Sequence, residues 1–158
     1  MSNLQRLHIV LHSPEIPGNA GSIGRTCLAL NAELILIKPY GFDIDEKAVR
    51  RAGLDYWKYV TVAEFDSWED FVHNKSPKLE ELFFIETKAK NSIYHAQFKN
   101  SVYIVFGSET KGLPEKIIQK YYDQTYELPM FSQHIRSLNL SNAATAAAYL
   151  AYGAFLKN

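Results

Sequence analysis

The fold class is decided by the run Leu34-Ile35-Leu36-Ile37, which contains no polar side chain. A strand with one face in water alternates apolar and polar residues, whereas a strand covered on both faces is apolar throughout. Strands of the second kind belong mainly to parallel sheets that carry helices on both sides. The run therefore predicts an α/β protein.

Strand and helix patterns alternate on either side of this run. Strands are expected at 7–11, 34–37, 59–62, 82–85, 102–106 and 125–128. Helices are expected at 19–30, from Asp45 to Gly53, at 63–73, at 115–121 and in a long C-terminal segment. The alternation predicts a mostly parallel sheet flanked by helices. Because no linker or repeat divides the chain, we expect one domain over residues 1–158.

The composition is that of a packed globular protein without a membrane span. Of 158 residues, 47% are hydrophobic and 13% are aromatic, which is typical of a folded chain. No apolar run approaches the roughly 20 residues of a transmembrane helix, and residues 1–6 lack the blocks of a signal peptide. A single cysteine, Cys27, excludes an internal disulfide. We therefore expect a cytoplasmic protein with no membrane partner.

Charge is balanced overall but unevenly placed along the chain. The formal net charge of +0 does not by itself indicate a nucleic-acid partner. Basic residues nevertheless form two groups, Lys47, Arg50, Arg51 and Lys58, and Lys88, Lys90 and Lys99. Such groups either bind phosphates or form a solvated helix face, and charge alone leaves both interpretations open.

Three loops follow expected strands, at 13–24, 107–114 and 129–141. Ligands of open parallel sheets bind beyond the carboxyl ends of the strands, so we expect these loops to converge. The first loop has glycines at 18, 21 and 24, a spacing that differs from the dinucleotide-binding G-x-G-x-x-G. Arg25 in the following helix either grips a phosphate or pairs with Glu15.

The second loop has Gly107 and Gly112 at P-loop spacing, but Leu113 stands where a P-loop has its lysine. Glu109 would also repel a phosphate. The loop therefore suits a hydroxyl-rich or cationic ligand, or is a tight turn before a helix that Pro114 starts.

The third loop ends in Arg136-Ser137-Leu138-Asn139-Leu140-Ser141-Asn142-Ala143, where four uncharged polar side chains precede an alanine-rich helix. One of them would suffice to cap the helix, and the small alanines allow a close approach. This stretch predicts a site for a polar, largely uncharged ligand.

Neither metal ligands nor a serine nucleophile can be recognised. The histidines at 8, 12, 73, 95 and 134 have no ligand spacing and Cys27 is solitary, so we expect no metal. His8 and His12 share a strand face, which favours a packing role. The absence of G-x-S-x-G disfavours a serine hydrolase of that type.

Four segments, taken together, are similar to one family. They are 17–27, 50–57, 106–114, and 128–130 with 136–143. They resemble the SPOUT class of RNA methyltransferases, specifically the small tRNA wobble-nucleotide 2′-O-methyltransferases, and they span almost the whole chain. The segment 50–57, Arg50-Arg51-Ala52-Gly53-Leu54-Asp55-Tyr56-Trp57, is typical of the wobble-nucleotide branch.

The resemblance implies a homodimer that methylates the ribose 2′-hydroxyl of nucleotide 34, cytidine or modified uridine, in tRNA. It implies S-adenosyl-L-methionine as methyl donor, held in a C-terminal trefoil knot, and a partner subunit that completes each site. The implied cofactor residues are Ile85, Thr87, Gly107, Glu109, Gly112, Leu128, Met130, Ser137, Leu138 and Asn142.

Catalytic and RNA-binding residues also follow from the resemblance. Arg25 matches the family's catalytic arginine, and we expect it to clamp the target phosphate, since a guanidinium keeps its proton. The residues expected to orient the ribose or the arginine are Asn19, Ser141 and Tyr149. The residues expected to bind the anticodon stem-loop are Arg50, Arg51 and Lys58. Tyr56 and Trp57 either stack on a loop base or form core or dimer contacts.

One departure from the family lies between Met130 and Arg136, where five residues stand and four are typical. We expect the loop 131–135 to bulge. Three alternatives stay open: methylation of another tRNA or rRNA site, an RNA-binding regulator without catalysis, and a nucleotide-cofactor oxidoreductase that uses 18–24. The intact Arg25 and Asn142 argue against the regulator.

Overall fold

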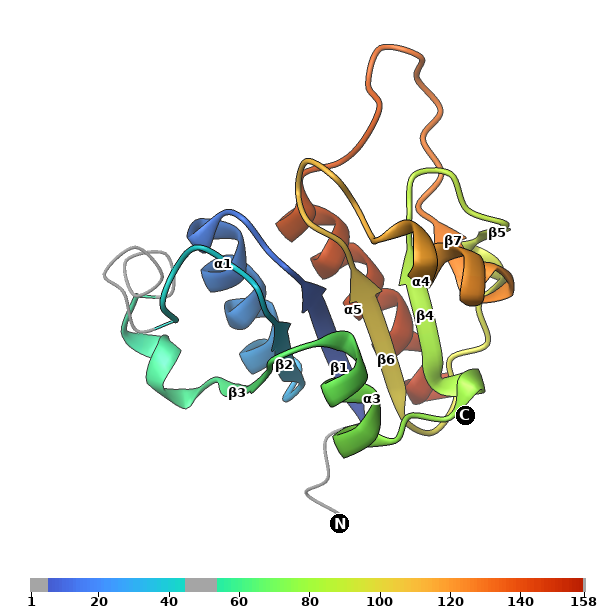
Figure 1. Cartoon of the computed structure of the whole chain (residues 1–158). Helices are drawn as coiled ribbons and strands as arrows, with labels where there is room; N and C mark the ends of the chain where they lie inside the picture. The colour runs from blue at the N-terminus through green and yellow to red at the C-terminus, as the bar shows by residue number, and fades with distance from the viewer. Residues whose placement is uncertain (1–5, 45–53, 158) are drawn as a thin grey trace.

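A seven-stranded sheet forms the centre of the molecule, which the computed structural model describes over residues 6–44 and 54–157 (Figure 1). The strands are β1 (Leu7–His12), β2 (Glu33–Ile37), β3 (Thr61–Phe65), β4 (Leu82–Ile85), β5 (Asn91–Ser92), β6 (Val102–Phe106) and β7 (Thr125–Glu127). Their order is β3-β2-β1-β6-β4-β7-β5, and every pairing in that sheet is parallel. The predicted parallel α/β architecture is confirmed.

Helices cover both faces of the sheet. On one face lie α1 (Pro17–Ala29) and α5 (Leu140–Lys157), and on the other lie α3 (Trp68–Lys75) and α4 (Glu115–Lys120). Ile9 and Leu11 of β1 enter the core beneath α1 and α5, whereas Val10 enters the core beneath α3 and α4. Both faces of β1 are therefore covered by helices, as expected for a strand inside a parallel sheet. The short 3₁₀ helices are η1 (Leu54–Tyr59), η2 (Leu79–Glu81), η3 (Ile93–His95) and η4 (Tyr122–Gln124).

The segment 59–73 differs from the sequence-based expectation. Ala63 pairs with Ile35, so the residues expected to begin a helix belong to β3, and the strand is displaced from 59–62. The helix begins only at Trp68, because Ser67 Oγ accepts a hydrogen bond from the Asp70 N–H at 3.0 Å. A serine cap is a helix-start signal that the expected boundary overlooked. The two-residue β5 was not expected, and the helix from Asp45 to Gly53 lies outside the described residues.

A buried polar cluster lies at the amino edge of the sheet, opposite the expected site. His8 Nδ1 is 2.7 Å from Glu33 Oε1, and its ring stacks on Tyr103 with 4.2 Å between centroids. Lys75 Nζ donates to Glu33 Oε2 at 3.0 Å. These contacts confirm the packing role expected for His8.

Two findings concern only the described part of the chain. No group of three or more His, Cys, Asp or Glu side chains at 6–44 or 54–157 is placed to hold a metal ion. Over the same residues, no helix is long and apolar enough to cross a membrane.

Candidate active site

A cavity of about 510 Å³ opens at the carboxyl edge of the sheet, above β1, β6, β4 and β7. Its volume falls in the roughly 300–1,000 Å³ of small-molecule sites. Its lining residues are Ile16, Asn19, Ile85, Glu86, Thr87, Phe106, Gly107, Ser108, Glu109, Thr110, Lys111, Gly112, Leu128, Met130, Arg136, Ser137, Leu138, Asn139, Leu140 and Ala143. All three loops singled out in the sequence contribute, so their predicted convergence is confirmed.

The loop after β6 is held against α1 by Glu109. The Glu109 carboxylate accepts hydrogen bonds from the Glu15 N–H at 2.8 Å, the Ile16 N–H at 2.6 Å and Asn19 Nδ2 at 3.2 Å. Ile16, the residue before α1, offers no capping side chain of its own. Glu109 therefore fixes the chain at the entrance to α1 from a distant loop, and its negative charge lies near the positive end of the helix dipole.

Glu15, in the loop before α1, in turn accepts hydrogen bonds from the loop that carries Glu109. Its Oε1 accepts hydrogen bonds from Thr110 Oγ1 at 2.6 Å and from the Thr110 N–H at 3.0 Å. The hydroxyl bond is the largest of the effects that lower the pKa of Glu15. The two loops are thus joined by reciprocal carboxylate contacts. No ion pair found among the described residues joins Arg25 to Glu15, so the pairing alternative is not supported.

Gly107 and Gly112 make the turn of the second loop possible. An added Cβ at Gly107 would lie 2.0 Å from the carbonyl carbon of Gly112 and 2.1 Å from the Leu113 nitrogen. Gly112 has φ +69°, a conformation that side chains rarely adopt. The Ser108 N–H donates to the Gly112 carbonyl at 3.3 Å, and the Gly112 N–H donates to the Ser108 carbonyl at 3.0 Å. Glycine is required at both positions, so the chain backbone itself forms this wall of the cavity.

Glu86 is a wall residue that the sequence analysis did not identify, although it named both neighbours, Ile85 and Thr87. Its Oε1 accepts a hydrogen bond from the Leu113 N–H at 2.8 Å. Burial raises the pKa of this half-buried carboxyl. A charged residue directly after an apolar strand, at the edge where ligands bind, is the sequence signal that identifies it.

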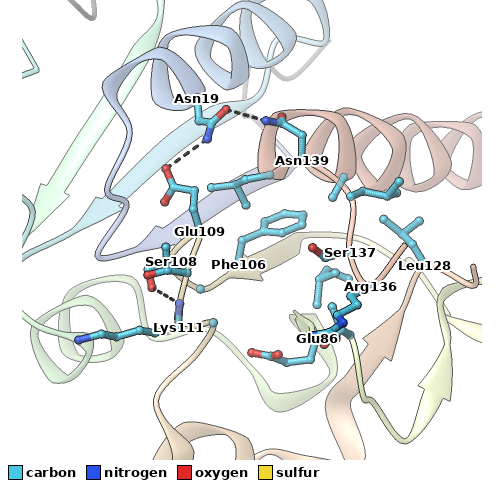
Figure 2. Close-up of a pocket in the computed structure, with 18 of the residues that line it drawn as sticks. Asn19, Glu86, Phe106, Ser108, Glu109, Lys111, Leu128, Arg136, Ser137 and Asn139 are labelled. Carbon is cyan, nitrogen blue, oxygen red and sulfur yellow. Dashed lines mark hydrogen bonds between the residues drawn. The ribbon is translucent and has the colours of Figure 1, made fainter. Parts of the chain in front are cut away.

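A polar chain joins α5, α1 and the second loop (Figure 2). Asn139 Nδ2 donates to Asn19 Oδ1 at 3.4 Å, and Asn19 Nδ2 donates to Glu109 Oε2. Asn139 Oδ1 also caps α5, because it accepts from the Ser141 N–H at 2.9 Å, Ser141 Oγ at 2.5 Å and the Asn142 N–H at 3.3 Å. The surplus of polar residues at the start of α5 is therefore explained in part by one cap and one inter-element bridge.

Most expected cofactor residues lie in the cavity wall. Those that line it are Ile85, Thr87, Gly107, Glu109, Gly112, Leu128, Met130, Ser137 and Leu138. Asn142 is exposed and lies outside the wall. Lining residues without a predicted role are Ile16, Glu86, Phe106, Ser108, Thr110, Lys111, Arg136, Asn139, Leu140 and Ala143.

The expected catalytic residues are less closely grouped. Asn19 lines the cavity and is buried, whereas Arg25, Ser141 and Tyr149 do not line it. The Arg25 guanidinium lies 5.2 Å from the centroid of the Tyr56 ring, and Tyr149 is 54% exposed. One chain alone does not bring Arg25 to its own cavity.

The expected RNA-binding residues lie away from this cavity or outside the described residues. Lys58 is exposed on η1, and Arg50 and Arg51 fall in the undescribed segment. Trp57 is buried against α1, where an added Cβ at Gly24 would lie 2.5 Å from its Cζ3. Of the two interpretations of Trp57, the structure supports the core contact.

Comparison with known proteins agrees with this geometry. A family model described as the SpoU rRNA Methylase family matches residues 6–149. A protein of Bacillus subtilis (strain 168) is 44% identical over 150 residues, which are 93% of this chain and 92% of that protein. A tRNA (cytidine(34)-2′-O)-methyltransferase of Saccharophagus degradans is 40% identical over 146 residues, 92% of this chain and 93% of that enzyme.

A solved structure described as giving insight into the 2-OH methylation of C/U34 on tRNA has the same fold. It superposes with a TM-score of 0.87 at 38% identity, covering 96% of this chain and 97% of the other. On the extent of the family match and the identity to full-length relatives, this chain belongs to the SpoU methylase family.

Proposed function

We propose that this chain transfers the methyl group of S-adenosyl-L-methionine to the ribose 2′-hydroxyl of nucleotide 34 in tRNA, a cytidine or a modified uridine. One observation carries the proposal. The cavity collects the expected donor-binding residues in a chain that is 40% identical, over 92% of its length, to a tRNA (cytidine(34)-2′-O)-methyltransferase. The family assignment replaces the oxidoreductase alternative.

The residues of the cavity fit the donor. When bound, S-adenosyl-L-methionine supplies a methyl group activated by its attachment to a positively charged sulfur. Ile85, Leu128 and Leu138 provide apolar walls of the kind that hold a flat base. The loop 107–112 presents backbone polar groups at close range, and Glu86 adds a carboxylate to the wall. The Glu86 carboxylate would repel a phosphate group, although Lys111 and Arg136 also line the cavity.

We propose that Glu109 shapes the donor site rather than attracting the donor by its charge. Its carboxylate is already engaged by two backbone N–H groups of the α1 start and by Asn19. Its effect on the donor therefore passes through the position of the loop 107–112. Of the two carboxylates in the wall, Glu86 is the one left to contact a cationic ligand.

We propose that Arg25 acts in the cavity of a second copy of the chain. At 1.5 Å per residue, Arg25 lies about 9 Å along α1 from the cavity-lining Asn19. α1 and α5 lie side by side, with Thr26 Oγ1 2.7 Å from Thr145 Oγ1. Their outer surface exposes both Arg25 and Tyr149. A homodimer that packs through this surface would bring both side chains to the cavity of the partner.

In that position Arg25 would clamp the phosphate beside the target and polarise the 2′-hydroxyl. A guanidinium donates to two phosphate oxygens in a planar fork and does not accept a proton, so it is no general base. Asn19 would orient the ribose from the cavity wall, and Tyr149 would do so from α5 of the second copy. Ser141 would act indirectly, because its hydroxyl donates a hydrogen bond to Asn139 Oδ1 and so helps to position Asn139.

The family resemblance supports three further parts of the proposal. The C-terminal third would be threaded as a trefoil knot around the donor site, although Asn142 itself lies outside the cavity wall. Lys58, with Arg50 and Arg51, contacts the backbone of the anticodon stem-loop. A tRNA substrate would place the activity in the cytoplasm.

Nucleoside mass spectrometry of tRNA incubated with the protein and isotope-labelled S-adenosyl-L-methionine tests the function. The expected product is labelled 2′-O-methylcytidine or a labelled 2′-O-methylated uridine derivative. Because the matching family is named for rRNA, ribosomal RNA should be incubated in parallel. Label in rRNA alone would transfer the proposal to that substrate, and label in no 2′-O-methylated nucleoside would end it.

A further inference from the structure

Phe131 is the most exposed large apolar side chain in the described part of the chain, with 95% of its surface accessible. It belongs to the loop 131–135, which leaves the cavity wall at Met130 and returns to it at Arg136. Figure 1 shows the segment between β7 and α5 projecting beyond the carboxyl edge of the sheet. An aromatic ring is thus held in water one residue away from the wall of the cavity.

The chain segment that carries Phe131 favours an anionic partner. Residues 128–158 include no Asp or Glu, although they carry Arg136. The cavity wall from which this segment departs carries the exposed Lys111 together with two carboxylates, Glu86 and Glu109, of which Glu109 is engaged at the start of α1. An exposed ring on a segment with a positive charge suits unpaired nucleic acid, because the charge attracts the backbone and the ring can stack on a base.

We infer that Phe131 stacks on an unpaired base of the RNA next to the nucleotide that receives the methyl group. The inference rests on the proposed function, because a ribose that enters the cavity draws its neighbours across the rim where Phe131 lies. Stacking tolerates any base. Phe131 is therefore a substrate-binding residue that sets the path of the RNA strand, and it does not touch the reacting atoms.

Steady-state kinetics with an anticodon stem-loop RNA tests the inference. Phe131→Ala should raise KM for the RNA about 5- to 100-fold, the loss of one aromatic–base stack. The kcat, the affinity for S-adenosyl-L-methionine and the oligomeric state should stay at wild-type values. Phe131→Trp should restore KM, whereas Phe131→Leu should not, because a leucine offers no ring. A matched control is Tyr122→Ala, which removes a 49% exposed ring at the amino edge of the sheet.

The base can be located with 2-aminopurine placed at one loop position at a time. Its fluorescence should be quenched by wild-type protein at one position and remain unquenched with Phe131→Ala. An RNA KM within twofold of wild type in Phe131→Ala, or full rescue by leucine, would overturn the inference. A shift of the dimer equilibrium in Phe131→Ala would assign the ring to a second copy of the chain instead. If wild-type protein methylates no RNA, the proposed function fails and this inference falls with it.

Discussion

Replacement of Glu109 by alanine should loosen the cavity wall by a calculable amount. The carboxylate accepts from the N–H groups of Glu15 and Ile16 and from Asn19 Nδ2. Hydrogen bonds to a charged group contribute about 1.5–3 kcal/mol when buried. Water reaches the two backbone N–H groups in the variant, so we expect a loss of about 1–2 kcal/mol in the free energy of unfolding.

Donor binding should weaken in the same variant, since Glu109 holds the loop 107–112 in place. If donor binding must reorder this loop, about 0.7–2 kcal/mol corresponds to about 3- to 30-fold in the Kd of S-adenosyl-L-methionine. Glu109→Gln retains one acceptor oxygen for the start of α1. Glu109→Gln should therefore lose about half as much unfolding free energy as Glu109→Ala.

Urea unfolding and calorimetric titration with the donor measure the two quantities. Glu80→Ala is the matched control, because it removes an exposed carboxylate of η2 and should change stability by less than about 0.5 kcal/mol. Equal losses of unfolding free energy in Glu109→Ala and Glu80→Ala would refute the role given to Glu109. A Glu109→Gln variant that is less stable than Glu109→Ala would refute it as well.

Three other substitutions test separate parts of the site. Gly107→Ala places a Cβ 2.0 Å from a backbone atom and should cost about 3 kcal/mol or more in unfolding free energy. The control, Gly153→Ala, has open space around it and should be neutral or stabilising. Equal urea midpoints for the two variants would contradict this prediction. Burial raises the pKa of Glu86 above 4.5, so its contribution to stability is full below that pH and is lost as the pH rises through the folded-state pKa. The stability of Glu86→Gln relative to wild type should therefore increase between about pH 4 and about pH 7. A difference in unfolding free energy between the two proteins that does not change with pH would contradict the raised pKa of Glu86. Arg25→Lys should lower kcat about 10- to 100-fold in single-turnover assays, since an ammonium lacks the planar fork, and near-normal turnover would remove the clamp.

The strands could be predicted where burial on both faces makes a sequence apolar throughout. The expected 82–85 and 102–106 match β4 and β6 residue for residue. The edge strand β3 is half-exposed, and the strand expected at 59–62 covers only its first two residues, because its mixed pattern from Ala63 onward resembles the start of a helix. The pairing of Ala63 with Ile35, a contact between distant segments, is what decides its conformation.

The site was predictable as a set of loops but not as a network. Parallel strand order brings the loops after β1, β6 and β7 to one edge, and this follows from the α/β pattern. The bridge from Asn139 through Asn19 to Glu109 joins segments about a hundred residues apart, so no local spacing indicates it. The distance between Arg25 and its own cavity likewise depends on where α1 lies in space.

The central claim is that the methyl group is transferred to the 2′-oxygen of nucleotide 34, and one substrate substitution tests it most directly. Anticodon stem-loop RNAs with a single 2′-deoxy nucleotide at position 33, 34 or 35 should be incubated with the protein and labelled S-adenosyl-L-methionine. Transfer should vanish for the RNA that lacks the 2′-hydroxyl at position 34 and persist for the other two. Undiminished transfer to the 34-deoxy RNA would contradict the account.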